Sequence, residues 1–381
     1  MSPCLAQPVA ITGYGLSSCT GGQAGLLFAA VACHQSFIQP DINYQATSPD
    51  GAGLAPVYLA RAAGLSIDEP AVQMLDLFES ALQDVSKSLP EELPDKPNLL
   101  LAVIPTEKHA RGRFINTYVW EKRIKNNLHK FKDFDIRFVQ SDCGIAALLQ
   151  QVCAELNHGL WGCVVFGAVD SLIDPLTVQE LGASLLVRST KNSDGHVPGQ
   201  AAGFVVLFDA EEARQLKLKP MGYLKGITSR SLETAQEISP KSLAGCFDEI
   251  MQAANLGKED IDQVVSNTGS IREHLMEWHY VTTKLWPMRA SEQETFAMQM
   301  GEIDQAQIDP ADCYEPKVER TSISLGDIGC SAFVIDIIYT LARFDFDYPK
   351  IDNVFAYEIE DTGEHSVLYL GREHTSERQA A

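Results

Sequence analysis

The sequence is poor in positive charge and has no paired cysteine motifs. Its 381 residues hold 30 Lys and Arg against 51 Asp and Glu, a formal net charge of −21. Because contacts with phosphates need clustered cations, this balance argues against nucleic-acid binding. The nine cysteines are dispersed, without a CxxC pair or the spacing of metal ligands. This distribution favours reduced thiols in a cytoplasmic protein over a disulfide framework.

Several segment types are also missing. The chain contains no run of eighteen uncharged apolar residues, so we expect no transmembrane helix and no membrane association. Its first residues, MSPCLAQPVAITGYG, lack the basic segment and apolar run of a signal peptide. The glycines that follow match neither a Walker lysine motif nor the dinucleotide fingerprint, and no GxSxG elbow occurs. We therefore expect a cytoplasmic protein without a cofactor or a metal.

The residues present alternate between strand-like and helix-like patterns. We expect strands over 8–15, 98–105, 163–172 and 202–209, a strand and a turn within 260–269, and a terminal hairpin over 353–360 and 365–372. We expect helices over 70–89, before His158, over 241–257 and within 322–344. In the first of these helices, Val72, Leu75, Phe78, Leu82 and Val85 form the expected apolar face. The alternation predicts an α/β unit of two comparable halves, 1–210 and 220–373, with a tail over 374–381.

One segment has the form of a nucleophile turn. Residues 136–149, IRFVQSDCGIAALL, predict a strand, a polar turn and the start of a helix. A helix N-terminus lowers a thiol pKa and stabilises an oxyanion, so Cys143 is a candidate nucleophile. Asp142 has the alternative role of a helix N-cap.

Five ordered segments resemble the β-ketoacyl-acyl carrier protein synthases, or ketosynthases, of the thiolase-like superfamily. DGHVPGQAAGFVVLFDAEEAR (194–214) resembles that family's DGF-x-x-GEGAG-x-x-VLE motif. The other four segments, in the family's order, are 9–22, 156–172, 246–270 and 321–341. The resemblance implies a thiolase-like fold of two pseudo-repeated halves in five αβαβα layers, with the active site between them. It also implies a dimer whose subunits continue one sheet across the interface.

The resemblance further implies where the catalytic groups of a ketosynthase would stand. The family uses a cysteine nucleophile and two histidines, which promote decarboxylation and stabilise the enolate. An ungapped comparison puts Asp142 at the cysteine position, and using Cys143 requires a one-residue deletion in the following helix. Such a deletion turns every later side chain by about 100°, so the continuous apolar stripe favours Asp142. The two histidines correspond to Gly269 and Asp327, and a nearby lysine corresponds to Ser322.

Accessory positions of the family have changed as well. Gln200 replaces the glutamate of GEGAG. The glycine-rich C-terminal turn is replaced by VFAYEIEDTGEH, whose acids Glu358, Glu360 and Asp361 would repel a phosphopantetheine phosphate. His274 and His279 flank Glu277 on a predicted helix, and no third histidine or cysteine suggests a metal site. We therefore expect no residue to be competent for standard condensation.

The segment 108–132 is basic within an acidic chain, with eight Lys and Arg and one acid. It has two interpretations. One is a docking surface for an acidic partner. The other is a solvated helical face that balances nearby acids. The docking interpretation names Phe114 and these possible contact residues: Arg111, Arg113, Tyr118, Trp120, Lys122 and Arg123.

These observations favour a catalytically inactive ketosynthase-like protein that acts through protein–protein association. It would form a homodimer, or a heterodimer with a ketosynthase-like subunit. One setting is an accessory or adaptor protein of a bacterial type VI secretion effector cluster, beside an effector or adaptor partner. A second is a chain-length-factor-like partner of an active ketosynthase, which implies contact with an acyl carrier protein. The competing enzyme hypothesis is a divergent acyltransferase or β-ketoacyl-ACP synthase that uses Cys143.

Overall fold

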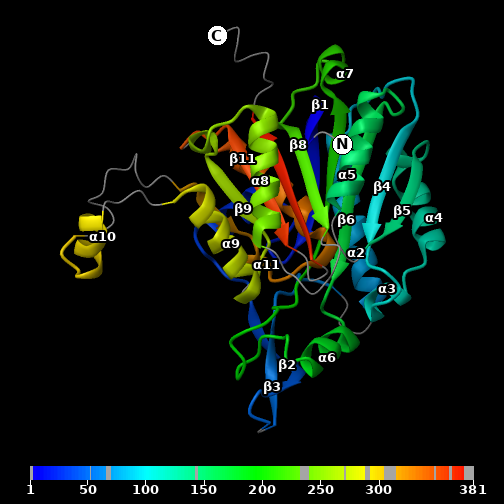
Figure 1. Cartoon of the computed structure of the whole chain (residues 1–381). Coiled ribbons are helices and arrows are strands. Elements are labelled where there is room, and N and C mark those ends of the chain that lie inside the picture. Colours follow the sequence, from blue (N-terminus) through cyan, green and yellow to red (C-terminus); the bar gives the residue numbers. More distant parts are fainter. Residues whose placement is uncertain are drawn as a thin grey trace.

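The structure is a computed structural model (Figure 1). It describes residues 3–51, 53–65, 70–141, 145–231, 240–269, 272–287, 292–303, 315–346, 349–359 and 363–372. None of the helices that these residues form combines the length and the apolar character that a bilayer span requires.

Strands and helices alternate through both halves of the chain. The first half contains β1 (Cys4–Ser18), α1 (Ala24–Ala32), β2 (Gln39–Thr47), β3 (Leu54–Leu59), α2 (Pro70–Ser88), β4 (Asn98–Ile104), α3 (Ala110–Arg113), α4 (Thr117–Asn127), β5 (Asp135–Gln140), α5 (Ala146–Asn157), β6 (Cys163–Ser171), α6 (Pro175–Ala183) and β7 (Gln200–Asp209). After α7 (Ala210–Gln215), the second half contains β8 (Gly222–Ser231), α8 (Pro240–Ala254), β9 (Gln263–Ser266), α9 (Arg272–Leu285), α10 (Glu292–Gln299), β10 (Lys317–Arg320), α11 (Ser322–Leu325), η5 (Gly329–Ser331), α12 (Ala332–Asp345), β11 (Asn353–Ile359) and β12 (Glu364–Gly371).

The two halves repeat one strand topology. The first five body strands lie in the order β5-β4-β6-β7-β1, and the last five lie in the order β10-β9-β11-β12-β8. In both series the first three strands are parallel and the last two pairings are antiparallel. β1 also pairs antiparallel with β8, which joins both series into one ten-stranded sheet. The predicted pseudo-repeat is therefore present in the hydrogen-bonding pattern.

The core divides into the predicted five layers. Leu99, Leu101 and Val103 of β4 belong to the central apolar cluster, together with residues of α5 and α12. Alternate residues of a strand point to opposite faces, so Leu100 and Ile104 instead join the cluster around α2. A third cluster packs α8 and α9 against the outer face of β9, β11 and β12. The arrangement is α2, the first strands, α5 with α12, the second strands, and α8 with α9 (Figure 1).

A small extension stands apart from these layers. β2 and β3 form a separate antiparallel pair that packs with α6 through its own apolar cluster. Figure 1 shows this extension projecting from one end of the body. The amide of Tyr58 in β3 donates to the carbonyl of Arg188, 3.1 Å away, and so connects the extension to the loop that precedes β7.

The expected elements are present, with one difference in burial. The turn and the long helix expected over 322–344 are present, with a short α11 first, then the turn at Gly326 and Gly329, which adopt positive φ angles of 69° and 54°, and then η5 and α12. Val72 of α2 remains 37% exposed, in contrast to the expected apolar face. At 100° per residue it lies about 120° around the helix from buried Phe78.

Candidate functional site

A cavity of about 460 Å³ lies where loops of both halves meet. The second half contributes Gly269 after β9, Ser322 at the start of α11 and Asp327 before η5. The first half contributes residues near β2, Tyr58 of β3, and the loop before β7. Gly269, Ser322 and Asp327 are the positions at which the sequence comparison places a ketosynthase's two histidines and its lysine. The fold therefore gathers these three separate positions around one cavity.

Gly269 and Ser322 form a polar but uncharged part of the wall. Apart from Gly269 and its chain neighbours, no atom of the described residues lies within 4 Å of the point where a side chain of Gly269 would begin. The Ser322 hydroxyl donates to the carbonyl oxygen of Thr268 at 2.8 Å, which holds it against the chain that leads to Gly269. Neither residue presents an imidazole or an ammonium group to the cavity.

Asp327 is held as a carboxylate. It contacts Nδ1 of His196, and its Oδ1 accepts from the Gly329 amide at 3.0 Å. Burial alone would raise the pKa of Asp327, but His196, the Gly329 amide and the charge of Arg111 together lower the pKa below its ordinary value. Asp327 is therefore ionised at neutral pH.

His196 is a site residue that the sequence analysis did not identify. It lines the cavity with Asp327, although 131 positions separate the two along the chain. In the DGHVPGQAAG stretch it replaces the phenylalanine of the DGF motif. This change from an apolar to a titratable side chain could have indicated a site residue. The contact with Asp327 itself forms only when the two halves pack together.

The predicted nucleophile turn falls in a gap between the described residues. Asp142 and Cys143 both lie outside the described residues, which end at Ser141 and resume at Ile145. The flanking β5 and α5 are present as predicted, so a strand leads into this segment and a helix follows it.

Solved structures resemble the chain over nearly its whole length. A chain of the complex between a type II PKS acyl-carrier protein and its ketosynthase bound to the hexaketide gives a TM-score of 0.70 at 14% identity, covering 96% of this chain and 100% of that one. A β-ketoacyl synthase from Burkholderia phymatum STM815 gives a TM-score of 0.69 at 13% identity, covering 97% and 100%. The chain has the thiolase-like fold of the ketosynthases. No protein-family model matches its sequence. No curated protein matches it either.

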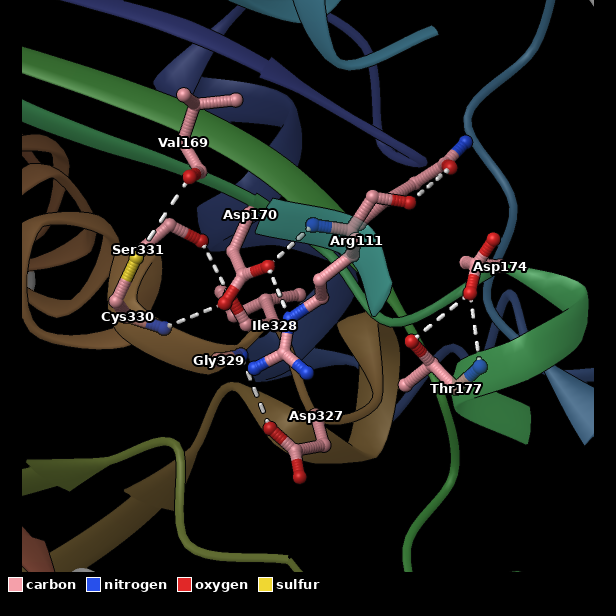
Figure 2. A network of polar contacts seen from close by, with 12 residues as sticks. Arg111, Val169, Asp170, Asp174, Thr177, Asp327, Ile328, Gly329, Cys330 and Ser331 are labelled. Atoms are coloured by element: carbon pink, nitrogen blue, oxygen red, sulfur yellow. Dashed lines mark hydrogen bonds and ion pairs between the residues drawn. The ribbon is translucent and has the colours of Figure 1, made fainter. Parts of the chain in front are cut away.

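Within this ketosynthase fold, a buried ion pair contacts the turn that contributes Asp327 to the cavity. Arg111 of α3 donates through Nε to Asp170 Oδ1 at 2.8 Å, and the two side chains are 10% and 1% exposed. Asp170 also accepts from the amides of Ser171 at 2.8 Å and Cys330 at 3.1 Å (Figure 2). The pair therefore ties α3 and β6 of the first half to the turn that carries Asp327 in the second.

Gln200 begins β7 beside this network. Its side chain is fully buried, and its Oε1 accepts from the Ser171 hydroxyl at 3.1 Å. Its Nε2 has no partner within the described part of the chain. The ketosynthase motif has a glutamate at this position. Gln200 therefore places a neutral side chain where the motif has an acidic one.

The predicted docking residues divide into buried and exposed groups. Trp120 is 3% exposed and packs on Phe78, with ring centroids 4.8 Å apart. The prediction that Trp120 and Arg111 belong to an exposed docking surface is therefore wrong. Trp120 is buried by its apolar contact with Phe78, and Arg111 is buried in its ion pair with Asp170. Tyr118 remains 62% exposed and Phe114 64%.

The other basic residues predicted for docking already have local partners. Arg113 donates to the carbonyl oxygens of Glu107 and Lys108 at 3.2 and 3.1 Å. Lys122 lies over the ring of Tyr118 at 4.4 Å, and Arg123 pairs with Glu79 at 2.7 Å. These contacts agree with a solvated helical face, and an acidic partner would compete with them.

The histidines of α9 do not converge on one point. His279 is exposed, whereas His274 is buried on the same helix. Glu277 contacts Nε2 of His365 in β12, and both side chains are buried. This pair fastens α9 to the outer face of the second strand series.

Proposed function

We propose that this ketosynthase-fold chain does not carry out decarboxylative condensation and instead acts through association with another protein. The observation that carries the proposal is the composition of the cavity. Gly269, Ser322 and Asp327 occupy it together, and none of the three can donate a hydrogen bond from an imidazole or an ammonium group.

The chemistry of condensation depends on such donors. Loss of carbon dioxide from a malonyl thioester leaves an enolate, whose negative charge must be stabilised as it develops. Asp327 carries a carboxylate whose pKa is lowered, so it would repel that charge. Gly269 offers no side chain in place of the other histidine.

His196 does not restore the missing pair of histidines. It supplies one imidazole, and Nδ1 of that ring is already engaged by Asp327. A ketosynthase-like reaction requires two donors that converge from separate loops of the second half, whereas His196 comes from the first half.

An edge of the sheet is suited to association. β5 ends the strand order, so one side of its backbone has no partner strand within the described residues. Edge strands readily pair with another chain. Trp120 of α4 packs against Phe138 of β5 at 6.1 Å, which places α4 beside this edge. With exposed Phe114 and Tyr118, the edge would form the contact of a homodimer or of a heterodimer with a ketosynthase-like subunit.

A decarboxylation assay tests the catalytic part of the proposal. Purified protein is incubated with a malonyl thioester, and release of carbon dioxide is compared with that of a Cys143→Ala variant. We expect both proteins to match the uncatalysed background. Release by the unchanged protein that Cys143→Ala abolishes would instead establish the divergent enzyme.

Light scattering after size exclusion tests the association part. We expect the protein to elute as a dimer, alone or with a co-purified subunit, and Phe114→Ser with Tyr118→Ser to dissociate it. Met276→Ser is the matched control, because Met276 is equally exposed at 62% but lies on α9. A monomer that captures no subunit, or a dimer unaffected by the paired substitution, would contradict the proposed interface.

The biological setting follows from the identity of the subunit. We favour the accessory or adaptor role in a bacterial type VI secretion effector cluster, because Gly269, Asp327 and Ser322 stand in the cavity where a ketosynthase has its two histidines and its lysine. Co-purification with an effector or adaptor would support this role. Co-purification with an active ketosynthase, and a change in its product length, would instead support the chain-length-factor-like role.

A further inference from the structure

We propose that the cavity binds a small molecule with an anionic head, a carboxylate or a phosphate, on a short apolar chain. Two arginines carry the inference. Arg188 enters from the loop before β7, and Arg320 ends β10, so the two halves of the chain each contribute one guanidinium.

Neither arginine has a counter-ion within the described residues. The guanidinium carbon of Arg188 lies 5.5 Å from the ring centroid of Tyr58, a contact that positions the group without neutralising it. Nε of Arg320 is buried, and no described residue forms a hydrogen bond with it. Both residues are partly buried, so water only partly solvates their charges and an anionic ligand would supply the missing counter-charge.

The charges that face the cavity favour an anion. Among the described residues that line it, the titratable groups besides the two arginines are Tyr58, His196 and Asp327. The carboxylate of Asp327 is already engaged by His196 and by the amide of Gly329. The remaining charge is therefore positive, in a chain whose formal net charge is −21.

The rest of the wall defines the body of the ligand. Ile38, Val197, Leu275 and Ile323 provide an apolar surface. A volume of about 460 Å³ lies within the roughly 300–1,000 Å³ of small-molecule sites. Because a thioester carbonyl carries no net charge, two guanidinium groups in the lining favour a free acid or a phosphate instead.

Calorimetric titration with three eight-carbon probes tests the inference. Octanoate and octyl phosphate carry the two anionic heads, and octanol carries the apolar chain alone. The protein variants are Arg188→Gln and Arg320→Gln, with Arg320→Lys as a charge-preserving variant. Arg214→Gln is the matched control, because Arg214 is an exposed arginine of α7 that does not line the cavity.

We expect at least one anionic probe to bind more tightly than octanol, and its identity distinguishes the two heads. Each Arg→Gln substitution should weaken that binding by about tenfold or more, since charge-assisted hydrogen bonds are lost. Arg320→Lys should retain part of the affinity, and Arg214→Gln all of it. Equal binding of octanol, no binding of either anion, or unchanged affinity in folded Arg188→Gln and Arg320→Gln would overturn the inference. None of these outcomes depends on the association proposed above.

Discussion

Removing the charge of Asp170 should destabilise the fold more than any surface change. Asp170→Asn keeps the shape of the side chain but leaves the buried guanidinium of Arg111 without the carboxylate that it contacts directly. The two side chains are 1% and 10% exposed, so solvent cannot replace the lost partner. Breaking a buried pair of this kind costs about 3–5 kcal/mol of unfolding free energy.

Urea unfolding at pH 7 followed by circular dichroism would measure this cost. Arg137→Gln is the control, because Arg137 and Asp135 pair at 2.7 Å with 51% and 46% exposure. Such an exposed pair should contribute less than about 1 kcal/mol. Arg111→Met combined with Asp170→Asn should recover most of the loss, since no unpaired charge remains. A loss no larger than that of Arg137→Gln, or a double variant weaker than Asp170→Asn alone, would refute the reasoning.

Three further tests, with five substitutions in all, probe burial and open space. Burial raises the pKa of Asp336 to about 8, so the folded chain keeps a proton that the unfolded chain loses near pH 4. Unfolding free energy should therefore fall between about pH 4 and about pH 8, and Asp336→Asn should remove this slope. Trp120→Ala should cost about 3–5 kcal/mol in urea unfolding, whereas Tyr118→Ala should change stability by less than about 0.5 kcal/mol. Gly269→Ala should also stay within about 0.5 kcal/mol, but Gly15→Ala should cost about 1–3 kcal/mol or more, because its new carbon would lie 2.1 Å from a carbonyl of α2. Equal losses of stability for Trp120→Ala and Tyr118→Ala, or for Gly15→Ala and Gly269→Ala, would contradict the close packing around Trp120 and Gly15.

Local patterns were sufficient for much of the fold. Continuous apolar runs predicted β4 and β6, because both faces of these strands are covered by helices. The five motifs predicted the thiolase-like arrangement, which the strand order and the solved structures confirm. These features depend on periodicity and motif order, both of which are visible in one dimension.

Side-chain neighbours across the halves were not predictable in this way. His196 meets Asp327 only because the loop before β7 packs against the turn before η5, and no periodic pattern encodes that contact. Arg111 and Trp120 lie in a segment dense in basic residues, where composition suggested exposure for all of them. Their burial depends on Asp170 and Phe78, which belong to other elements.

The position of β1 in the sheet has a consequence for synthesis of the chain. β1 is made before every other described strand, yet its partners are β7 and β8. Roughly 180 residues separate Ser18 from Gln200, so at about 5–20 residues per second β1 waits on the order of 10–40 s for a partner. During that interval, both edges of a 15-residue strand are open to pairing with other chains. The nascent protein should therefore depend on chaperones that bind extended segments, and slower translation after residue 18 should increase its aggregation.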